Sequence, residues 1–418
     1  MLNALRSLTV DGRLLFATRF VRLFAYGALS VVLVLYLVDL GLTESATGLL
    51  LTMTLLGDTL VSLYLTTRAD RFGRRRMLVA GAVLMAAAGV AFAFTHRFWL
   101  LVVAGTIGVI SPSGQEVGPF LSIEQAALSQ VVPARSRTDV FAWYTLAGSV
   151  ATALGALAAG LLTSSLQHSW APVDSYRAVV VAYAGLGAAL CGLFLKASDR
   201  VEAPRTDRAA APQSPLARLS GLHESQGVVL RLSGLFALDS FGGGFVVQSF
   251  AAYWFYLRFG VDPKTLGALF FAANVFAGLS ALVASRLANR IGLVNTMVVT
   301  HLPSNVLLML VPFAPNLATA IGLLLARSAL SQMDVPTRSS YVMAVVRPEE
   351  RPAAASITAV PKTFAWAAGS MISGYLLTLS AFGWPLLIGG AVKAVYDLTL
   401  LLKFQKVKPP EEIELPLR

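Results

Sequence analysis

A short, densely charged segment between two long apolar runs constrains the fold of this chain more than any other feature. Residues 68–76 read RADRFGRRR, which places six charges in nine residues. The apolar runs 45–67 and 77–94 on either side are each about long enough for a membrane-spanning helix, which needs about 20 residues. Lys and Arg at the ends of a span resist translocation. The sequence therefore predicts a tight cytoplasmic loop between two membrane helices, with Gly73 at the turn.

Composition extends this interpretation to the whole chain. Of the 418 residues, 56% are hydrophobic and 13% are charged, whereas a soluble chain carries about 25% charged residues. The sequence thus indicates an all-α polytopic membrane protein and excludes a soluble enzyme. The net charge of +11 lies between apolar runs, so it indicates topology rather than a nucleic-acid partner. The single Cys191 excludes a disulfide framework and a Cys-rich metal site.

Long apolar stretches predict twelve membrane-spanning helices. The fourth and tenth contain proline, so we expect them to be kinked or to extend past the bilayer. The predicted spans are 14–38, 46–68, 76–95, 98–130, 138–165, 176–198, 228–258, 264–288, 293–312, 316–346, 352–380 and 384–404.

The distribution of Lys and Arg predicts the orientation. With both termini in the cytoplasm, 23 of the 33 basic residues fall on the cytoplasmic side and four in the outer loops, as positive charge does in an inner or plasma membrane. The long polar stretch 196–227 carries three prolines and predicts a flexible cytoplasmic linker. It separates an N-terminal six-helix half, 1–195, from a C-terminal half, 228–418, which ends in a short cytoplasmic tail.

The two halves resemble each other in sequence. Residues 69–73 align with residues 288–292 at a spacing of 219, as a diverged copy of the charged segment. Gly155 aligns with Gly369 at a spacing of 214. About five extra residues therefore lie in the first half, and we place them at 111–119. The fold prediction is twelve helices in two pseudo-symmetric halves.

At the charged segment the chain resembles the major facilitator superfamily of secondary transporters. The family's loop between helices 2 and 3 reads Gly-x-x-x-Asp-Arg/Lys-x-Gly-Arg/Lys-Arg/Lys, although Thr66 replaces the leading Gly here. The resemblance implies the superfamily fold, alternating access around a midplane site between the halves, and a gating role for this loop. The matching residues are Asp70, Arg71, Gly73, Arg74 and Arg75.

Two further patterns leave alternatives open. Residues 155–160 are similar to the family's antiporter motif, Gly-Pro-x-x-Gly-Gly, with Ala156 and Ala159 as departures. Small residues also serve any closely packed helix pair. The sequence has no phosphate loop, His-Glu-x-x-His or Gly-x-Ser-x-Gly motif, so we expect no enzyme activity, cofactor or metal. We interpret the four histidines as surface residues near span ends: His96, His168, His223 and His301.

Charges inside the predicted spans are the candidates for function. Each costs about 2.5–3.5 kcal/mol at a helix centre, so it usually faces a cavity or a partner. Arg19 either snorkels to the headgroups or faces the cavity, and we interpret Lys393 and Asp397 as a structural i,i+4 pair. The proton-coupling or substrate-cavity candidates are Arg22, Asp58, Glu116, Glu124, Asp239, Arg327, Asp334, Arg338 and Lys362.

Local context separates some of these candidates. Asp58 lies near the midplane as either an ion-pair partner or a proton site. Glu116 and Glu124 flank Pro119 and share a face if the fourth span is one helix. Asp239 precedes three glycines, which suit close helix approach or local unwinding. Asp334 and Arg338 have the spacing of an i,i+4 pair.

The sequence therefore predicts a monomeric secondary transporter in the bilayer that exports small organic solutes. Protons drive it through an acid among Glu116, Asp239 and Asp58. The loop from Asp70 to Arg76 locks the outward-facing state through charge contacts between the halves. One alternative is uptake or exchange of an organic anion, which Arg22, Arg327, Arg338 and Lys362 suggest. The other is a transporter-like sensor without flux.

Overall fold

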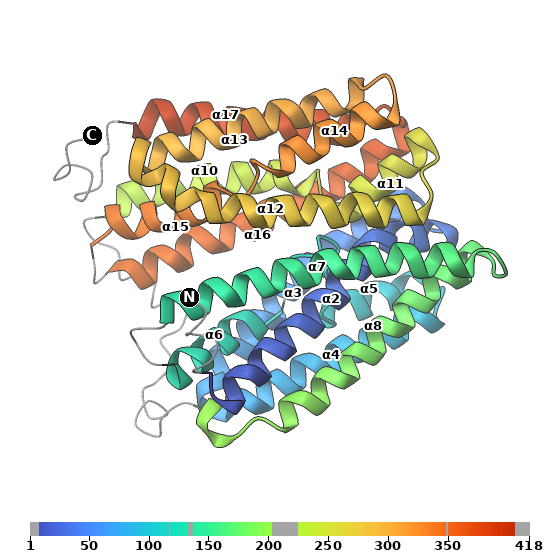
Figure 1. Cartoon of the computed structure of the whole chain (residues 1–418), viewed down its shortest axis with the longest axis horizontal. Helices are drawn as coiled ribbons and strands as arrows, with labels where there is room; N and C mark the ends of the chain where they lie inside the picture. The colour runs from blue at the N-terminus through green and yellow to red at the C-terminus, as the bar shows by residue number, and fades with distance from the viewer. Residues whose placement is uncertain (1–7, 117, 133–136, 203–224, 348–349, 406–418) are drawn as a thin grey trace. The chain divides into compact units, whose positions relative to one another are not determined.

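The computed structural model describes residues 8–116, 118–132, 137–202, 225–347 and 350–405. Within these ranges every regular element is a helix. The chain divides into two compact units. The first comprises Met1–Pro212 with Gly260–Phe271, and the second comprises Gln213–Phe259 with Ala272–Arg418. Their helices are labelled in Figure 1.

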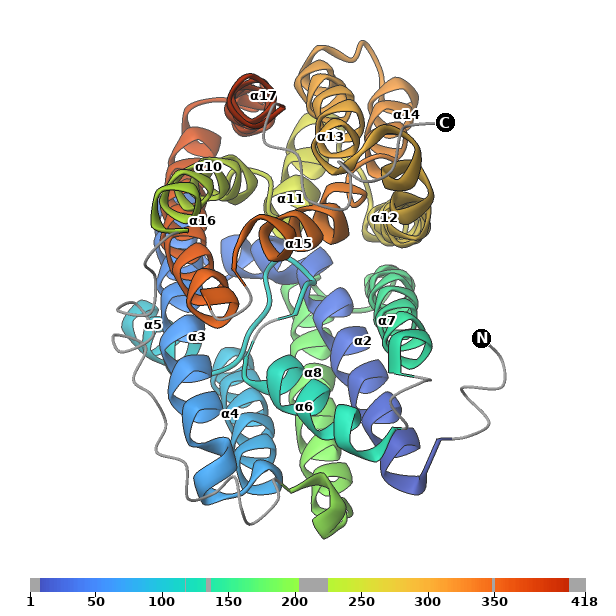
Figure 2. The ribbon, with the colours of Figure 1, turned by 90° about the vertical axis from the view of Figure 1, so that its left-hand side faces the viewer.

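The first unit is organised around one long buried helix. This helix, α2, is apolar from Leu23 to Leu37 and packs against α7 and α8, while α4 packs on the other side of α8 (Figure 2). The described elements are α2 (Val10–Asp39), α3 (Glu44–Phe72), α4 (Arg74–Phe94), α5 (Phe98–Ile107), α6 (Phe120–Val131), α7 (Arg137–Leu166), α8 (Pro172–Leu195) and η2 (Asp199–Val201).

The second unit is built in the same way. Helix α10 packs against α16 and α17, and α13 packs against α17 and α15 (Figure 2). The elements are α10 (Gln226–Gly244), α11 (Gln248–Phe259), α12 (Pro263–Ile291, whose first nine residues belong to the first unit), α13 (Leu293–Leu310), η4 (Val311–Phe313), α14 (Leu317–Ser328), α15 (Asp334–Val345), α16 (Arg351–Leu379) and α17 (Trp384–Phe404).

The predicted spans correspond to these helices, with three differences. The described residues contain nine helical stretches that are long and apolar enough to cross a membrane. Kinks were expected in the fourth and tenth spans, but each is broken into two helices, α5 with α6 and α14 with α15. The seventh span is also broken, because α10 ends at Gly244 after three successive glycines, which are poor helix formers.

The internal repeat is confirmed by the helix boundaries. Helices α3 and α12 are separated at both their starts and their ends by the larger of the two repeat spacings, the one found at the charged segment. The starts of α6 and α15 are separated by the smaller spacing, and so are the starts of α7 and α16. The extra residues of the first half therefore lie between Ile107 and Phe120, where we placed them.

Helix packing within each unit depends on aligned glycines. A Cβ atom at Gly155 of α7 would lie 2.0 Å from the carbonyl oxygen of Phe24 in α2. A Cβ atom at Gly369 of α16 would lie 2.2 Å from the carbonyl oxygen of Phe241 in α10. Only glycine permits such backbone approach. Close helix packing therefore accounts for Gly155, the first residue of the segment that resembles the antiporter motif.

The charged segment 68–76 is mostly helical, so the prediction of a loop across it was wrong in extent. Helix α3 continues to Phe72, α4 begins at Arg74, and only Gly73 separates them. Its φ of +107° lies in a region that glycine adopts readily, so one residue is enough to end a helix and start the next. Gly292, with φ of +85°, separates α12 from α13 in the same way.

Candidate functional site

Arg22 is the centre of a buried ionic network in the first unit. Its guanidinium makes a two-pronged contact with Glu124, with Nη1–Oε1 at 2.8 Å and Nη2–Oε2 at 2.7 Å. The same group contacts Glu116 through Nε at 3.2 Å and Nη2 at 3.1 Å. Both Arg22 and Glu124 are fully buried. One arginine therefore holds two carboxylates from either side of the break in the fourth span.

Neighbouring side chains complete this network. Arg19 donates to Glu116 at 2.6 Å and lies over the ring of Tyr144. Thr18 donates to Glu124 at 2.8 Å, and the Tyr144 hydroxyl also donates to Glu124. Arg19 is buried and paired, so it does not snorkel to the headgroups. Two arginines and two glutamates balance in charge, as buried ions require.

Glu116 reaches this network from an irregular segment and not from a helix. Residues 108–119 between α5 and α6 are not helical, so the prediction that Glu116 and Glu124 share one helix face was wrong. Neighbouring side chains satisfy part of the freed backbone: Ser111 donates to the Gln115 carbonyl oxygen at 2.7 Å, and Tyr183 to that of Val109. Irregular backbone at membrane depth is tolerated only against protein or a water-filled cavity.

Asp58 of α3 differs from these two glutamates. No cationic side chain lies within ion-pair distance of it in the described ranges, and its Oδ1 atom is buried without a hydrogen-bond partner. The groups that interact with it electrostatically are the Gly118 backbone amide, the Ser62 hydroxyl and the carboxylate of Glu116. The first network is therefore balanced in charge without Asp58, which is an additional acid beside it.

Asp239 is the centre of a second network, in the second unit. Its Oδ2 accepts from Arg338 at 2.9 Å and its Oδ1 accepts from Lys393 at 2.7 Å. Arg338 also pairs with Asp334, as the i,i+4 spacing predicted. Lys393 therefore pairs across helices with Asp239, and the interpretation of Lys393 and Asp397 as a pair within α17 was wrong.

His301 of α13 joins this second network, so its interpretation as a surface histidine was wrong. Its side chain is only 5% exposed. Its Nδ1 atom lies 2.8 Å from Oδ1 of Asp397, and Asn305 donates to Oδ2 of Asp397 at 2.8 Å. The sequence held a signal for this contact. His301 and Asn305 are four residues apart inside an apolar run and therefore share one helix face.

Two further cations have no carboxylate partner among the described residues. Arg327 lies in the last turn of α14, and its buried Nε atom has no hydrogen-bond partner. Lys362 follows Pro361 inside α16. It interacts electrostatically with Asp239 and Asp334, but it forms no ion pair with either. Both residues are positively charged groups that remain available to an anion.

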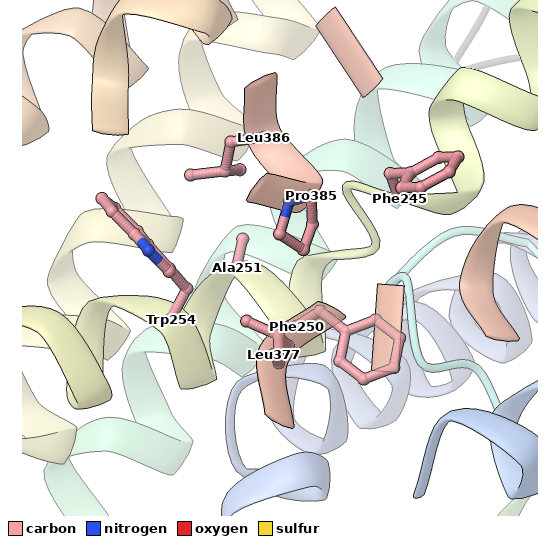
Figure 3. Close-up of a pocket in the computed structure, with 7 residues that line it drawn as sticks. All are labelled: Phe245, Phe250, Ala251, Trp254, Leu377, Pro385 and Leu386. Atoms are coloured by element: carbon pink, nitrogen blue, oxygen red, sulfur yellow. The ribbon is translucent and has the colours of Figure 1, made fainter. Parts of the chain in front are cut away.

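A small apolar pocket in the second unit contains none of these charged groups. Figure 3 shows its lining, which includes Phe245, Phe250 and Trp254. Its volume is about 10 Å³, which is near the lower limit for a single water molecule. It cannot hold a solute, so the candidate site is the set of buried ionic networks and not this pocket.

Comparison with known proteins identifies the family. The sequence profile of the Major Facilitator Superfamily matches residues 15–257 and 235–417. This chain belongs to the Major Facilitator Superfamily. An uncharacterized membrane protein of Saccharomyces cerevisiae is 31% identical over 422 residues, which cover 94% of each chain. The nucleoside transporter NupG superposes with a TM-score of 0.75 at 14% identity, covering 94% of this chain and 100% of NupG. The quinolone resistance protein NorA of Staphylococcus aureus is 30% identical over 112 residues, covering 27% of this chain and 28% of NorA.

Membership in the Major Facilitator Superfamily establishes the general class of this protein. It is an integral multi-pass membrane protein with the superfamily fold, and a secondary transporter of small molecules in the lipid bilayer rather than an enzyme. The similarity to NupG extends over nearly the whole chain, whereas the similarity to NorA covers about a quarter of it.

The superfamily motif at the start of α4 is held within the first unit. Glu202 accepts hydrogen bonds from the backbone N–H groups of Arg74 at 2.7 Å and Arg75 at 3.3 Å. An acidic side chain at this helix N-terminus satisfies free donors and complements the helix dipole. The Arg75 side chain donates to the Ala197 carbonyl oxygen at 3.0 Å. Arg71 is exposed, and the side chain of Asp70 lies outside the described part of the structure.

These contacts also show the position of the first residues of the predicted linker. Ser198 donates to Asp11 of α2 through its backbone N–H at 3.0 Å and through its hydroxyl at 2.6 Å. Together with Glu202 it connects the starts of α2 and α4 to the segment that follows α8. Residues 203–224, the rest of the predicted linker apart from its last three residues, lie outside the described ranges.

Proposed function

We propose that this protein exports small organic solutes by alternating access, driven by protons that bind to Asp58. The observation that carries this proposal is the contrast among the three candidate acids. Glu116 is paired with Arg19 and Arg22, and Asp239 is paired with Arg338 and Lys393. Asp58 alone among the three has no cation partner in the described ranges.

A proton carrier must exist in both charge states during the cycle. A carboxylate held by two cations keeps its charge, because protonation would leave those cations uncompensated in a buried site. A carboxylate without a cation gains from protonation whenever its surroundings exclude water, since an isolated buried charge is costly. Binding of a proton at Asp58 therefore changes the relative free energy of the water-exposed and water-excluded states of its site, which is the requirement for coupling.

The export of organic solutes is supported only by the partial relative. NorA carries the name of a quinolone resistance protein, and its similarity covers 27% of this chain. We therefore choose a fluorescent quinolone as the first probe, together with the cationic dye ethidium. The gating role of Asp70 to Arg75 and the cytoplasmic position of both termini belong to the same proposal.

The test is proton-driven efflux from proteoliposomes that contain the purified full chain. An imposed pH gradient should drive movement of a probe in the wild type. Asp58→Asn should abolish it while leaving probe binding measurable, and Asp58→Glu should retain part of it. Asp174→Asn serves as the control, because Asp174 is a partly exposed acid paired with Arg177. Unchanged pH-driven flux in Asp58→Asn would remove Asp58 from the mechanism.

A second candidate function is uptake or exchange of an organic anion. Arg327 and Lys362 favour it, because each is a cation in a membrane helix without a carboxylate partner among the described residues. Such residues usually mark a substrate pathway or a partner.

The same proteoliposomes separate the two functions. Counterflow of radiolabelled dicarboxylates or nucleotides that fails in Lys362→Gln or Arg327→Gln, with no movement of quinolone or ethidium, would favour the anion transporter. Absence of flux for every probe, with ligand-dependent thermal stabilisation retained, would favour a sensor.

A further inference from the structure

We propose that His301 is a second proton-binding site of this protein, in which a buried imidazole carries a proton between Asp397 and Asp239. This site lies in the second unit and is separate from Asp58. Its role in transport rests on the proposed function, but the binding of the proton does not.

The geometry encloses the imidazole between two carboxylates. Nδ1 lies 2.8 Å from Oδ1 of Asp397, and Nε2 lies 3.7 Å from Oδ1 of Asp239. The ring of Tyr396 packs edge-on against the imidazole, with 6.0 Å between centroids. Only the imidazolium form carries an N–H on both ring nitrogens. Carboxylates on both sides therefore favour the protonated state.

The charges around His301 leave Asp397 dependent on it. Asp239 is paired with two cations and Asp334 with Arg338, but Asp397 has no Lys or Arg within ion-pair distance in the described ranges. Asn305 donates to Asp397 but carries no charge. The titratable and charged groups on the helices that surround His301 are Asp239 (α10), Arg327 (α14), Asp334 and Arg338 (α15), Lys362 (α16), and Lys393, Tyr396 and Asp397 (α17).

Loss of this proton has a structural consequence. The Asp397 side chain is fully buried, and without the imidazolium it would be a buried carboxylate with only neutral hydrogen-bond donors. That state is costly, so release of the proton requires water or a cation to reach Asp397. Movement of α13 relative to α17 would admit them, and proton release at His301 is thereby linked to a conformational change.

The test reads the imidazole directly in the full-length protein. Substituting Gln for His96, His168 and His223 leaves His301 as the only histidine. Nitrogen-15 NMR of this protein, labelled at histidine and reconstituted in lipid, distinguishes imidazolium from neutral imidazole. A companion protein that retains only His168, which is exposed, gives the reference. Addition of His301→Gln confirms the assignment by loss of the signal.

We expect imidazolium at pH 7 for His301 and the neutral form for His168. Asp397→Asn should convert the His301 signal to the neutral form at the same pH, because it removes the counter-ion. Neutral imidazole at His301 down to pH 5.5, or an imidazolium signal that Asp397→Asn leaves unchanged, would overturn the proposal. Size-exclusion profiles and circular dichroism verify that each variant is folded.

Transport measurements then separate this inference from the proposed function. If His301 carries a coupled proton, His301→Gln lowers the number of protons moved per quinolone or ethidium molecule, measured from reversal potentials, while Asp58→Asn abolishes coupling. If no probe moves in any variant, the proposed function fails, yet the NMR result for His301 stands. If the NMR result fails while Asp58→Asn abolishes flux, only the present inference fails.

Discussion

Substitution of Arg22 by methionine tests whether the first buried network stabilises the fold. The change removes the only cation that contacts Glu124 among the described residues, and Glu124 is fully buried. Thr18 and Tyr144 still donate to Glu124, but neither neutralises its charge. Glu116 keeps its contact with Arg19 at 2.6 Å. The cost is therefore concentrated on one uncompensated carboxylate, and breaking a buried ion pair in this way costs about 3–5 kcal/mol.

The reverse substitution should cost less. Glu124→Gln leaves Arg22 in contact with Glu116, so the remaining charge still has a partner. We expect a loss of about 1–3 kcal/mol, the usual cost of an impaired buried hydrogen bond. The double variant Arg22→Met with Glu124→Met removes both charges, and apolar side chains of similar volume often replace a buried pair without loss. The double variant should thus be more stable than Arg22→Met alone.

The assay is unfolding of the purified full chain in mixed micelles of increasing dodecyl sulfate content, followed by circular dichroism. Arg177→Met provides the control, because Arg177 pairs with the partly exposed Asp174 and such pairs contribute only about 0–1 kcal/mol. A loss below about 1 kcal/mol for Arg22→Met would refute the reasoning, since the predicted range begins near about 3 kcal/mol. A double variant as unstable as the sum of its single changes would refute it as well.

Three other predictions concern packing, gating and topology. Gly155→Ala should lower the unfolding midpoint in the same assay, because its Cβ would lie 2.0 Å from a backbone oxygen; Gly185→Ala, which meets nothing within 4 Å, should be neutral or stabilising. Asp70→Asn should leave expression intact but shift spin-label distances between cytoplasmic ends toward the inward-open state, and unchanged distances would make the segment a topology anchor only. Cysteines placed in 196–226 should react with impermeant reagents only from the cytoplasmic side, so labelling in intact cells would contradict the orientation.

The fold followed from the sequence because the membrane restricts the possible structures. Apolar length identifies spans, and every backbone group of a span needs an internal partner, so helices were the expected elements. The difference between the two repeat spacings also located the insertion between Ile107 and Phe120. The breaks were harder to predict, because proline indicates a distortion but not its extent.

The ionic partners followed only partly from the sequence. The pair Asp334 with Arg338 lies within one helix, so its spacing of four residues was sufficient. Pairs between helices, such as Lys393 with Asp239, depend on helix rotation and packing, which a single sequence does not contain. His301 was missed because histidine is common at span ends, although its apolar surroundings and its spacing from Asn305 indicated a buried face.

The two units use the same ionic connection with opposite polarity. Glu124 and Arg338 are each the fifth residue of α6 and α15, the helices that follow the breaks. In the first unit an arginine of α2 binds the acid on α6, whereas in the second an aspartate of α10 binds the cation on α15. The feature common to the repeats is thus the connection between the first helix of each half and the helix after the break, whichever charge lies on either side.

The residues that this common connection does not explain are the ones with unbalanced charge. At the larger repeat spacing, Asp58 of α3 corresponds to Ala277 of α12, and His301 of α13 corresponds to Ala82 of α4. A group needed to connect helices would be expected in both repeats, since both contain the same helix pairs. A titratable group present in one repeat and replaced by alanine in the other is better explained by a function that each half performs once. This asymmetry supports Asp58 and His301, rather than the paired acids, as the sites where protons bind.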